Sequence, residues 1–186
     1  MAASVKKQMY LYATADGVAP EVRANQKISA SEGILIPGAP LFLSTSGTWD
    51  LAITSAGSSN DAWHGFLVGL QDPTATWPMT AAQAVNTEIR VLIIDPDDTY
   101  AVRVNASGTD SAATQAIIGN NYGLTVSATS GQVGYTSLDT DNSNATVKVT
   151  QVMGNVEPSK YDLTSTPGVA LVKFLAAVVT DTQATS

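Results

Sequence analysis

The chain has 186 residues, of which 44% are hydrophobic and only 13% are charged, with no cysteine and a single histidine. The lack of cysteine excludes disulfides, thiolate metal sites and thiol nucleophiles, and one histidine excludes any site that needs two imidazoles. The net charge of −7 argues against binding to nucleic acid, because a negative surface repels phosphate backbones.

The charge is distributed unevenly along the chain. Residues 1–30 carry four cations and two anions, giving +2, whereas residues 31–186 carry five cations and fourteen anions, giving −9. We therefore predict an N-terminal arm with the first strand at 1–30, in contact with a partner, and a single β-rich body at 31–186. A basic start that is merely solvated is the alternative interpretation of this charge pattern.

The first half of the chain consists of short segments bounded by turn-forming residues, which is typical of strands. Strands are predicted at Gln8–Thr14, Gly33–Ile36, Pro40–Ser44, Trp49–Thr54 and His64–Leu70. The segment Gln71–Thr87 follows as the longest predicted loop. Within it, Thr80–Val85 is a helix candidate, weaker than the helix predicted after Asp110. Trp77 of this loop is expected to pack against the body or a neighbouring subunit, since an indole is costly to leave in water.

The middle of the chain predicts a hairpin. Glu88–Ile94 is an apolar run broken only at Arg90, which predicts a central strand covered on both faces. The sequence Asp95-Pro96-Asp97-Asp98 then favours a type I turn. Such a turn would fold Thr99–Val104 back beside Glu88–Ile94.

One short α-helix is predicted, with Asp110 as its N-cap and Gly119 as its stop. Strands at Tyr122–Ala128, Ala145–Met153 and Val169–Val179 complete the prediction. The last segment also has the composition of a helix, but its four valines favour a strand. The expected fold class is all-β, or β-dominated: a compact barrel or sandwich of many short strands with one short α-helix.

Catalytic motifs are few. A Ser-His-Asp triad would have to use His64, and the chain has no Gly-x-Ser-x-Gly elbow, so His64 is better interpreted as a strand-edge residue with its polar end in water. Phosphate-binding glycine loops are absent, and nothing in the sequence singles out a pair of glycosidase carboxylates. We therefore predict no catalytic residue, no cofactor and no enzymatic activity.

Two acidic clusters have spacings that calcium sites use, Asp95-x-Asp97-Asp98 and Asp139-x-Asp141-Asn142. Neither completes an EF-hand, because both lack the glycine at the sixth loop position and the glutamate at the twelfth. We interpret both clusters as turns in which carboxylates accept backbone N–H groups, and predict no metal site.

No segment predicts membrane insertion or export. The longest apolar candidate, Val169–Val179, is shorter than a bilayer span and contains Lys173. The N-terminus has neither an apolar core nor a cleavage site of the kind that signal peptides have. The expectation is a protein that has no membrane partner and remains in the compartment where it is made.

A family resemblance is carried by short strand patterns punctuated by glycine and proline. They are Gly33–Ser44, Gly47-Thr48-Trp49, Phe66–Leu70, Ile89–Tyr100, Ile118–Leu124 and Ser137–Asp139. Over roughly residues 30–155 the chain resembles capsid decoration (cement) proteins and related head proteins of tailed bacteriophages. The resemblance implies a β-rich homotrimer on the outer surface of the virion capsid, bound to the major capsid protein after synthesis in the host cytoplasm.

Within that interpretation, residues Ala2–Tyr12 are predicted to be part of the anchor on the capsid. The candidate partner-binding residues are cationic or of types enriched at interfaces: Lys6, Lys7, Met9, Tyr10, Tyr12 and, in the long loop, Trp77. The alternative is that Tyr10 and Tyr12 face the core of the protein itself.

Two other functions stay open at this point. The first is a glycan- or host-binding module on the virion, in which Trp49, Trp63 or Trp77 would be exposed for stacking on sugars. The second is a hydrolase centred on His64.

Overall fold

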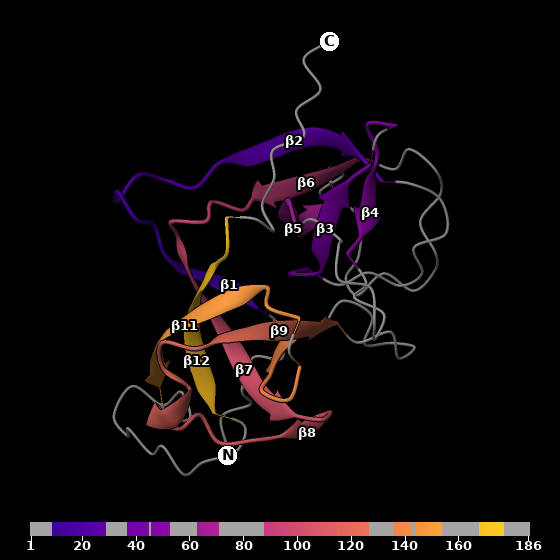
Figure 1. The fold of residues 1–186 in the computed structure, drawn as a ribbon. Coiled ribbons are helices and arrows are strands. Elements are labelled where there is room, and N and C mark those ends of the chain that lie inside the picture. The colour runs from indigo at the N-terminus through magenta and orange to yellow at the C-terminus, as the bar shows by residue number, and fades with distance from the viewer. Residues whose placement is uncertain are drawn as a thin grey trace, which may run out of the picture.

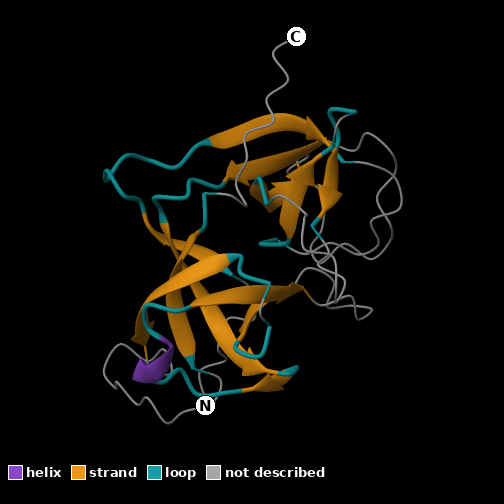
Figure 2. Ribbon diagram, viewed as in Figure 1, coloured by secondary structure: helices purple, strands orange, loops and turns teal. Residues whose placement is uncertain are grey.

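The computed structural model describes residues 9–28, 37–44, 46–52, 63–70, 88–126, 136–142, 144–153 and 168–176. Within these ranges the chain forms twelve strands in two sheets and one short 3₁₀ helix, which confirms the predicted β-dominated fold (Figure 2). The first sheet contains β1 (Tyr10–Ala13), β7 (Thr99–Ala106), β8 (Thr109–Asp110), β9 (Asn121–Val126), β10 (Thr136–Asp139), β11 (Val147–Met153) and β12 (Val169–Phe174). The second contains β2 (Val22–Lys27), β3 (Pro40–Leu43), β4 (Trp49–Leu51), β5 (Gly65–Leu70) and β6 (Glu88–Ile93).

The first sheet closes on itself. Its strands pair in the order β7-β10-β9-β11-β12, and β12 pairs again with β7, so five strands form a ring. Within the ring only β7 and β10 run parallel. Strands β1 and β8 extend the two edges of β7. We call this unit, β1 with β7–β12, the large barrel. Closure leaves few exposed strand edges.

The second sheet curls in the same way. Its order is β2-β6-β5-β3-β4, and a parallel bridge between Ile28 and Trp49 joins the two ends of that order. The indole Nε1 of Trp49 also donates a hydrogen bond to Oε1 of Gln26, at 2.9 Å. We call β2–β6 the small barrel; in Figure 1 it lies above the large one. The chain therefore starts in the large barrel with β1, crosses to the small barrel and returns at β7.

Each barrel has its own core. Alternate residues of β7, namely Tyr100, Val102 and Val104, are buried inside the large barrel. The small barrel is filled by a separate cluster that includes Leu41, Trp49, Leu51, Leu67 and Val91. Burying each of these side chains contributes about 1.5–3 kcal/mol to folding, so both barrels have a sizeable hydrophobic driving force.

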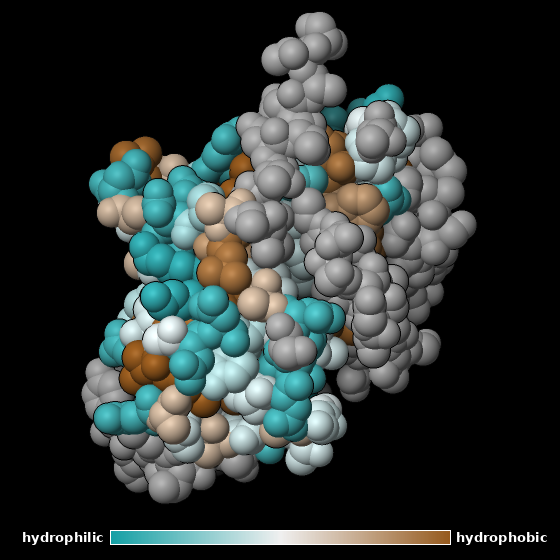
Figure 3. Space-filling model, in the orientation of Figure 1, coloured by the Kyte–Doolittle hydropathy of each residue, from teal (hydrophilic) through white to brown (hydrophobic). Residues whose placement is uncertain are grey.

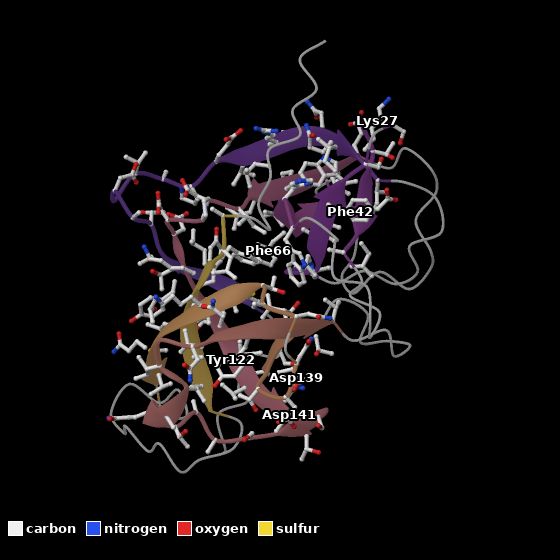
Figure 4. The ribbon with its side chains drawn as sticks, in the orientation of Figure 1. Lys27, Phe42, Phe66, Tyr122, Asp139 and Asp141 are labelled. Carbon is white, nitrogen blue, oxygen red and sulfur yellow. The ribbon has the colours of Figure 1, made fainter. Side chains whose placement is uncertain are left out.

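An aromatic cluster joins the two barrels. Phe66 of β5 lies between them (Figure 4), with its ring centroid 5.6 Å from Tyr100 of β7 and 6.1 Å from Phe174 of β12. Trp63, which precedes β5, lies 5.8 Å from Phe174. Because these rings come from both units and are all buried, the core of the large barrel extends to the small barrel, and the two barrels are expected to unfold together.

The predicted turn at Asp95–Asp98 is confirmed, but the hairpin around it is wrong. The Asp98 N–H donates to the carbonyl of Asp95 at 3.1 Å, as a type I turn requires. The strands on either side do not pair: β6 lies between β2 and β5, and β7 pairs with strands of the large barrel. The turn therefore carries the chain from one barrel to the other. The residues of a turn determine that the chain reverses direction, but they do not determine which strands pair.

The prediction that β6 is a central strand is confirmed, whereas the prediction that both its faces are covered is wrong. Glu88 and Arg90 are exposed while the alternate residues Ile89 and Val91 are buried. The strand therefore has one face in the core of the small barrel and, at these two charged positions, one face in water.

The predicted α-helix after Asp110 is also wrong. Asp110 belongs to β8 and its carboxylate lies 3.3 Å from the Arg103 guanidinium. Ser111 donates its N–H to the carbonyl of Val104 and accepts the N–H of Gly168 on its own carbonyl. These bonds compete with a helix, so only the single 3₁₀ turn η1 (Gln115–Ile117) forms.

The remaining predictions are confirmed only in part. The strand at Val169–Val179 is confirmed over the described β12, against the helical alternative. Strands β2, β8 and β10 are additional to the prediction. The predicted strand Gly33–Ile36, the loop Gln71–Thr87 with its helix Thr80–Val85, and the boundary between residues 30 and 31 lie outside the described residues. The division into arm and body therefore stays a prediction, although β1 and β2 are each integrated in a barrel.

The buried phenol of Tyr100 gives the protein a predictable alkaline response. Burial raises the pKa of Tyr100 well above its usual value near 10, and the carboxylates of Asp98 and Asp95 raise it further, against a hydrogen bond with the Asp95 backbone that lowers it. The folded protein therefore keeps this proton while the unfolded chain loses it above pH 10, so stability falls as pH rises.

We expect Tyr100→Phe to remove this contribution, which amounts to at most about 1.4 kcal/mol per pH unit for one proton. Urea unfolding of both proteins between pH 8 and pH 11 measures it as a difference in slope. Because the other tyrosines are present in both proteins, this difference in slope reports on Tyr100 alone. Parallel stability curves for the two proteins would contradict the prediction.

Candidate partner-binding surface

A cleft of about 440 Å³ opens beside the two segments that connect the barrels. One wall is the β1–β2 connection, from Thr14 to Pro20, with the start of β2. The second wall is the β6–β7 connection, from Ile94 to Asp98. The floor comes from the small barrel and includes Leu43, Trp49 and His64. The cleft therefore exists because the chain passes twice between the barrels.

Hydrogen bonds hold the wall formed by the β1–β2 connection. The N–H of Ala15 donates to Oδ1 of Asp98 at 2.9 Å, which ties it to the other wall. The N–H of Val18 donates to Oδ1 of Asp16, also at 2.9 Å, and Gly17 between them adopts a left-handed conformation with φ of +72°. This Asp-Gly turn directs the following residues outward from the body of the protein.

The cleft is lined by four carboxylates, those of Asp16, Glu21, Asp95 and Asp98, and by one guanidinium, that of Arg23. Arg23 forms an ion pair with Glu21, with Nε 2.6 Å from Oε1. With an uncharged imidazole the charge in the cleft is −3, so the site has a negative potential.

His64 is not the solvent-facing strand-edge residue that we expected. It is partly buried and its Nδ1 accepts the N–H of Leu43 at 2.8 Å, which places the ring against β3. A nitrogen that accepts a backbone N–H carries no proton itself, so the neutral ring has its proton on Nε2. The bond gives His64 a structural role between β3 and the start of β5.

Exposed apolar side chains concentrate on the β1–β2 segment. Among the described residues, five large hydrophobic side chains are exposed, and three of these lie within residues 12–22: Tyr12 at 52%, Val18 at 62% and Val22 at 47%. Figure 3 shows hydrophobic atoms at the projecting connection, bordered by hydrophilic ones. We call Tyr12, Val18 and Val22 the apolar face. Exposed apolar side chains gathered in one segment are a candidate contact surface.

The predicted anchor residues separate by the alternation of β1. Met9 is buried in the core of the large barrel, and Leu11 packs against the same core. Tyr10 and Tyr12 point to the opposite side, where Tyr10 is half-buried and Tyr12 is exposed. Met9 is thus removed from the predicted contact set, because its side chain has no surface to offer. Lys6, Lys7 and Trp77 lie outside the described residues.

The alternative expectation, that Tyr10 faces the protein itself, holds in part. Tyr10 packs on an outer cluster of the large barrel formed by Ala101, Val169 and Leu171. Burial, with a smaller contribution from neighbouring Tyr12, raises the pKa of the Tyr10 phenol. Tyr10 is therefore partly covered by the protein itself, and Tyr12 is the residue of the pair that a partner can reach.

The indoles expected to serve as sugar-stacking platforms are enclosed by the protein at two of the three positions. Trp49 and Trp63 are both buried, each with 1% of its surface exposed. Trp49 lies inside the small barrel and Trp63 packs on Phe174. A glycan-binding role built on these two residues is therefore wrong. Trp77 is not within the described ranges.

Both acidic clusters form turns, as predicted. Oδ1 of Asp95 accepts the N–H of Asp97, and Oδ1 of Asp139 accepts the N–H of Asp141. Asp139 and Asp141 lie together at the large barrel in Figure 4, where Oδ2 of Asp141 accepts the Ser107 hydroxyl. Among the residues that the structure describes, no group of three or more His, Asp or Glu side chains could hold a metal ion.

Sequence reasoning did not identify Val18, Val22 or Asp98 as site residues. A usable signal was present for Val18, which stands between Asp16-Gly17 and Pro20, where a hydrophobic residue in a turn has no strand in which to be buried. Asp98 offered no comparable signal, since its burial depends on the approach of the β1–β2 connection.

Comparison with known proteins adds no further constraint. No protein-family model matches the chain, and neither a curated protein nor a solved structure does. In the described part of the chain, no helix has the length and apolarity to cross a membrane. The fold and the surface together define a β-dominated, two-barrel protein with an apolar face beside an acidic cleft.

Proposed function

We propose that this protein is a structural component of a tailed-bacteriophage virion: a decoration protein that binds the outer surface of the head, to the major capsid protein, and stabilises the shell. The observation that supports this most is the apolar face on the β1–β2 segment, because three exposed hydrophobic side chains lie within eleven residues. That segment overlaps residues 1–30, the N-terminal region that the charge distribution predicts to contact a partner.

The proposed mechanism is contact area repeated by symmetry, without catalysis or a cofactor. Each copy would bury its apolar face against a seam between capsomers, and a homotrimer would present three such faces at once. Because linked contacts act at a high effective concentration, a modest individual affinity becomes tight binding. Rupture of the shell must then break contacts that a bare shell lacks, and so binding stabilises the intact state.

The direct test is to mix the purified protein with mature heads assembled without it, sediment the heads and image the pellet. We expect bound protein at symmetry-related positions, and decorated heads that survive a higher temperature than bare ones. Heads that pellet without any bound protein, at concentrations well above those found in infected cells, would overturn the proposal.

Charge placed on the apolar face should weaken binding. In Val18→Asp/Val22→Asp two exposed valines become carboxylates, which must be desolvated at an apolar contact. Losing the burial of the two half-exposed valines costs at least about 1.4 kcal/mol in total, so we expect at least about a tenfold loss of affinity for heads. Quantitative pelleting at a series of protein concentrations measures this loss.

The matched control is Ile118→Asp, which places a carboxylate on another exposed hydrophobic residue, 41% accessible and just after η1. In Figure 1 η1 lies at the far end of the large barrel from the β1–β2 connection. We expect Ile118→Asp to bind heads like the unmodified protein. Equal losses in the control and in the double variant would mean that the apolar face is not the contact.

A further inference from the structure

One dipeptide of the β1–β2 connection has the composition for a spontaneous change of the backbone. Asp16 is followed by Gly17, and no other aspartate or asparagine in the chain is followed by glycine. A side-chain carboxyl group can react with the backbone nitrogen of the next residue to form a five-membered cyclic imide. Glycine favours this reaction, because it has no Cβ to crowd the attacking nitrogen.

The structure leaves both reacting groups accessible. Asp16 and Gly17 are exposed, and they lie in a connection between strands. In the part of the chain that the structure describes, the N–H of Gly17 donates no hydrogen bond. Nothing lies within 4 Å of the position that a Cβ would take on Gly17. The nitrogen of Gly17 is therefore neither held by a hydrogen bond nor crowded from the side of the missing Cβ.

A hydrogen bond keeps the carboxyl group of Asp16 near this nitrogen. Oδ1 of Asp16 accepts the N–H of Val18 at 2.9 Å, which closes a hydrogen-bonded ring around the peptide bond between Asp16 and Gly17. Because the ring includes both Cγ of Asp16 and the nitrogen of Gly17, the hydrogen bond limits how far these two atoms can separate. A reaction between two groups is faster when the structure holds them together.

From these observations we infer that Asp16 converts spontaneously to isoaspartate in the free protein. In the first step the nitrogen of Gly17 bonds to Cγ of Asp16, and its proton leaves with the carboxyl hydroxyl group as water. In the second step a water molecule opens the imide. Attack at Cγ restores aspartate, whereas attack at the backbone carbonyl carbon of Asp16 breaks the bond from that carbon to Gly17. The chain then runs through Cβ and Cγ, and the overall reaction neither gains nor loses atoms.

The product changes the shape of the contact segment. Isoaspartate adds one methylene group to the backbone, and Cγ becomes a peptide carbonyl, so the side-chain turn that holds the Val18 N–H is lost. Val18 belongs to the apolar face, whereas Ala15, on the other side of the insertion, stays tied to the opposite wall of the cleft. The modification should therefore displace Val18 from the rest of the apolar face and weaken binding to the partner. This consequence rests on the proposed function, but the chemistry does not.

The chemistry is tested without any capsid. The full-length protein is incubated for several weeks at pH 6, beside a synthetic peptide of residues 8–23. Trypsin releases the same peptide from the protein, and electron-transfer fragmentation distinguishes isoaspartate from aspartate at residue 16. The tryptic peptide 91–103 holds the internal control, Asp97, which is exposed in a turn but is followed by aspartate. We expect isoaspartate to accumulate at Asp16 at least about tenfold faster than at Asp97. Reaction in the synthetic peptide but not in the protein would overturn the inference.

Two variants should change the rate in opposite directions. Gly17→Ala places a methyl group beside the attacking nitrogen, and we expect the rate to fall at least about threefold. Asp16→Asn keeps the Oδ1 acceptor and reaches the same imide with loss of ammonia. Its rate should rise at least about threefold, because an amide does not have to be protonated first, as an ionised carboxylate does. Thermal unfolding verifies that both variants are folded, and equal rates in all three proteins would contradict the inference.

The effect on binding is measured with aged protein, which contains both forms, and with too few heads to bind all of it. The heads are sedimented, and the isoaspartate content of pellet and supernatant is compared. We expect the isoaspartate fraction to be at least about threefold higher in the supernatant than in the pellet. If heads bind the two forms equally, the decoration function stands and the inferred loss of binding is wrong. If isoaspartate forms but heads bind neither form, the chemistry stands and the decoration function falls.

Discussion

Replacing Phe174 by alanine is expected to lower the free energy of unfolding by about 3–5 kcal/mol. Phe174 is buried at the end of β12 and is the common neighbour of the three other rings in the aromatic cluster. Its ring meets Tyr100 edge-on, with the centroids 5.3 Å apart and an interplanar angle of 82°. Removing it takes away both apolar burial and the favourable edge-to-face geometry, and leaves a cavity where the barrels meet.

The control is Phe42→Ala, which deletes the same atoms from a partly buried residue packed against the same core. A smaller loss is expected there, since less surface leaves water. Guanidinium unfolding of all three proteins, followed by tryptophan fluorescence and by far-ultraviolet circular dichroism, measures both effects. If Phe174→Ala cost no more than Phe42→Ala, the aromatic cluster would not be the joint between the barrels.

Most of the strands could be predicted because they depend on local pattern. At β7 the alternation of Tyr100, Val102 and Val104 with smaller or polar residues matches the two-residue period of a strand, and these three side chains are indeed buried. At β12 the valines outweighed the helical composition. Local preference and tertiary packing agree at these positions, so the sequence alone was sufficient.

Pairing could not be predicted in the same way. The turn at Asp95–Asp98 has the expected hydrogen bond, yet β6 and β7 belong to different barrels. Closure of the large barrel depends on β12 meeting β7 from about 70 residues further along the chain. Register across such a separation is decided by the whole set of buried faces, which no short window contains. The helix prediction failed for a related reason, since Gly168 binds the Ser111 backbone from a distant segment.

At the candidate site, too, some features follow from the local sequence and others depend on tertiary packing. Tyr12 was predicted as a contact residue because tyrosine is enriched at interfaces, and its position on the outward face of β1 leaves it accessible. Met9 has an equally suitable side chain but the opposite parity on the strand, which places it in the core. The cleft could not be predicted from the sequence, because its walls come from the β1–β2 and β6–β7 connections, which meet only when both barrels have formed.

Gly168→Ala is expected to be strongly destabilising, more so than alanine at the other described glycines of the large barrel. Gly168 lies just before β12, where its carbonyl accepts the Val104 N–H and its own N–H donates to the Ser111 carbonyl. A Cβ at this position would stand 2.1 Å from the backbone nitrogen of Ala113. Backbone cannot rotate away as a side chain can, so both hydrogen bonds would have to shift. We expect a loss of about 3 kcal/mol or more, at the upper end of the range for overpacking.

Gly17→Ala separates this steric effect from the conformational cost of replacing a glycine. Gly17 has a left-handed φ of +72°, but a methyl group added there would meet nothing within 4 Å, so alanine should cost only about 1–2 kcal/mol. Thermal unfolding of both variants beside the parent measures the difference. A Gly168→Ala protein as stable as Gly17→Ala would show that residues 111–113 can move away from β12, and would contradict the close packing that replaces the predicted helix.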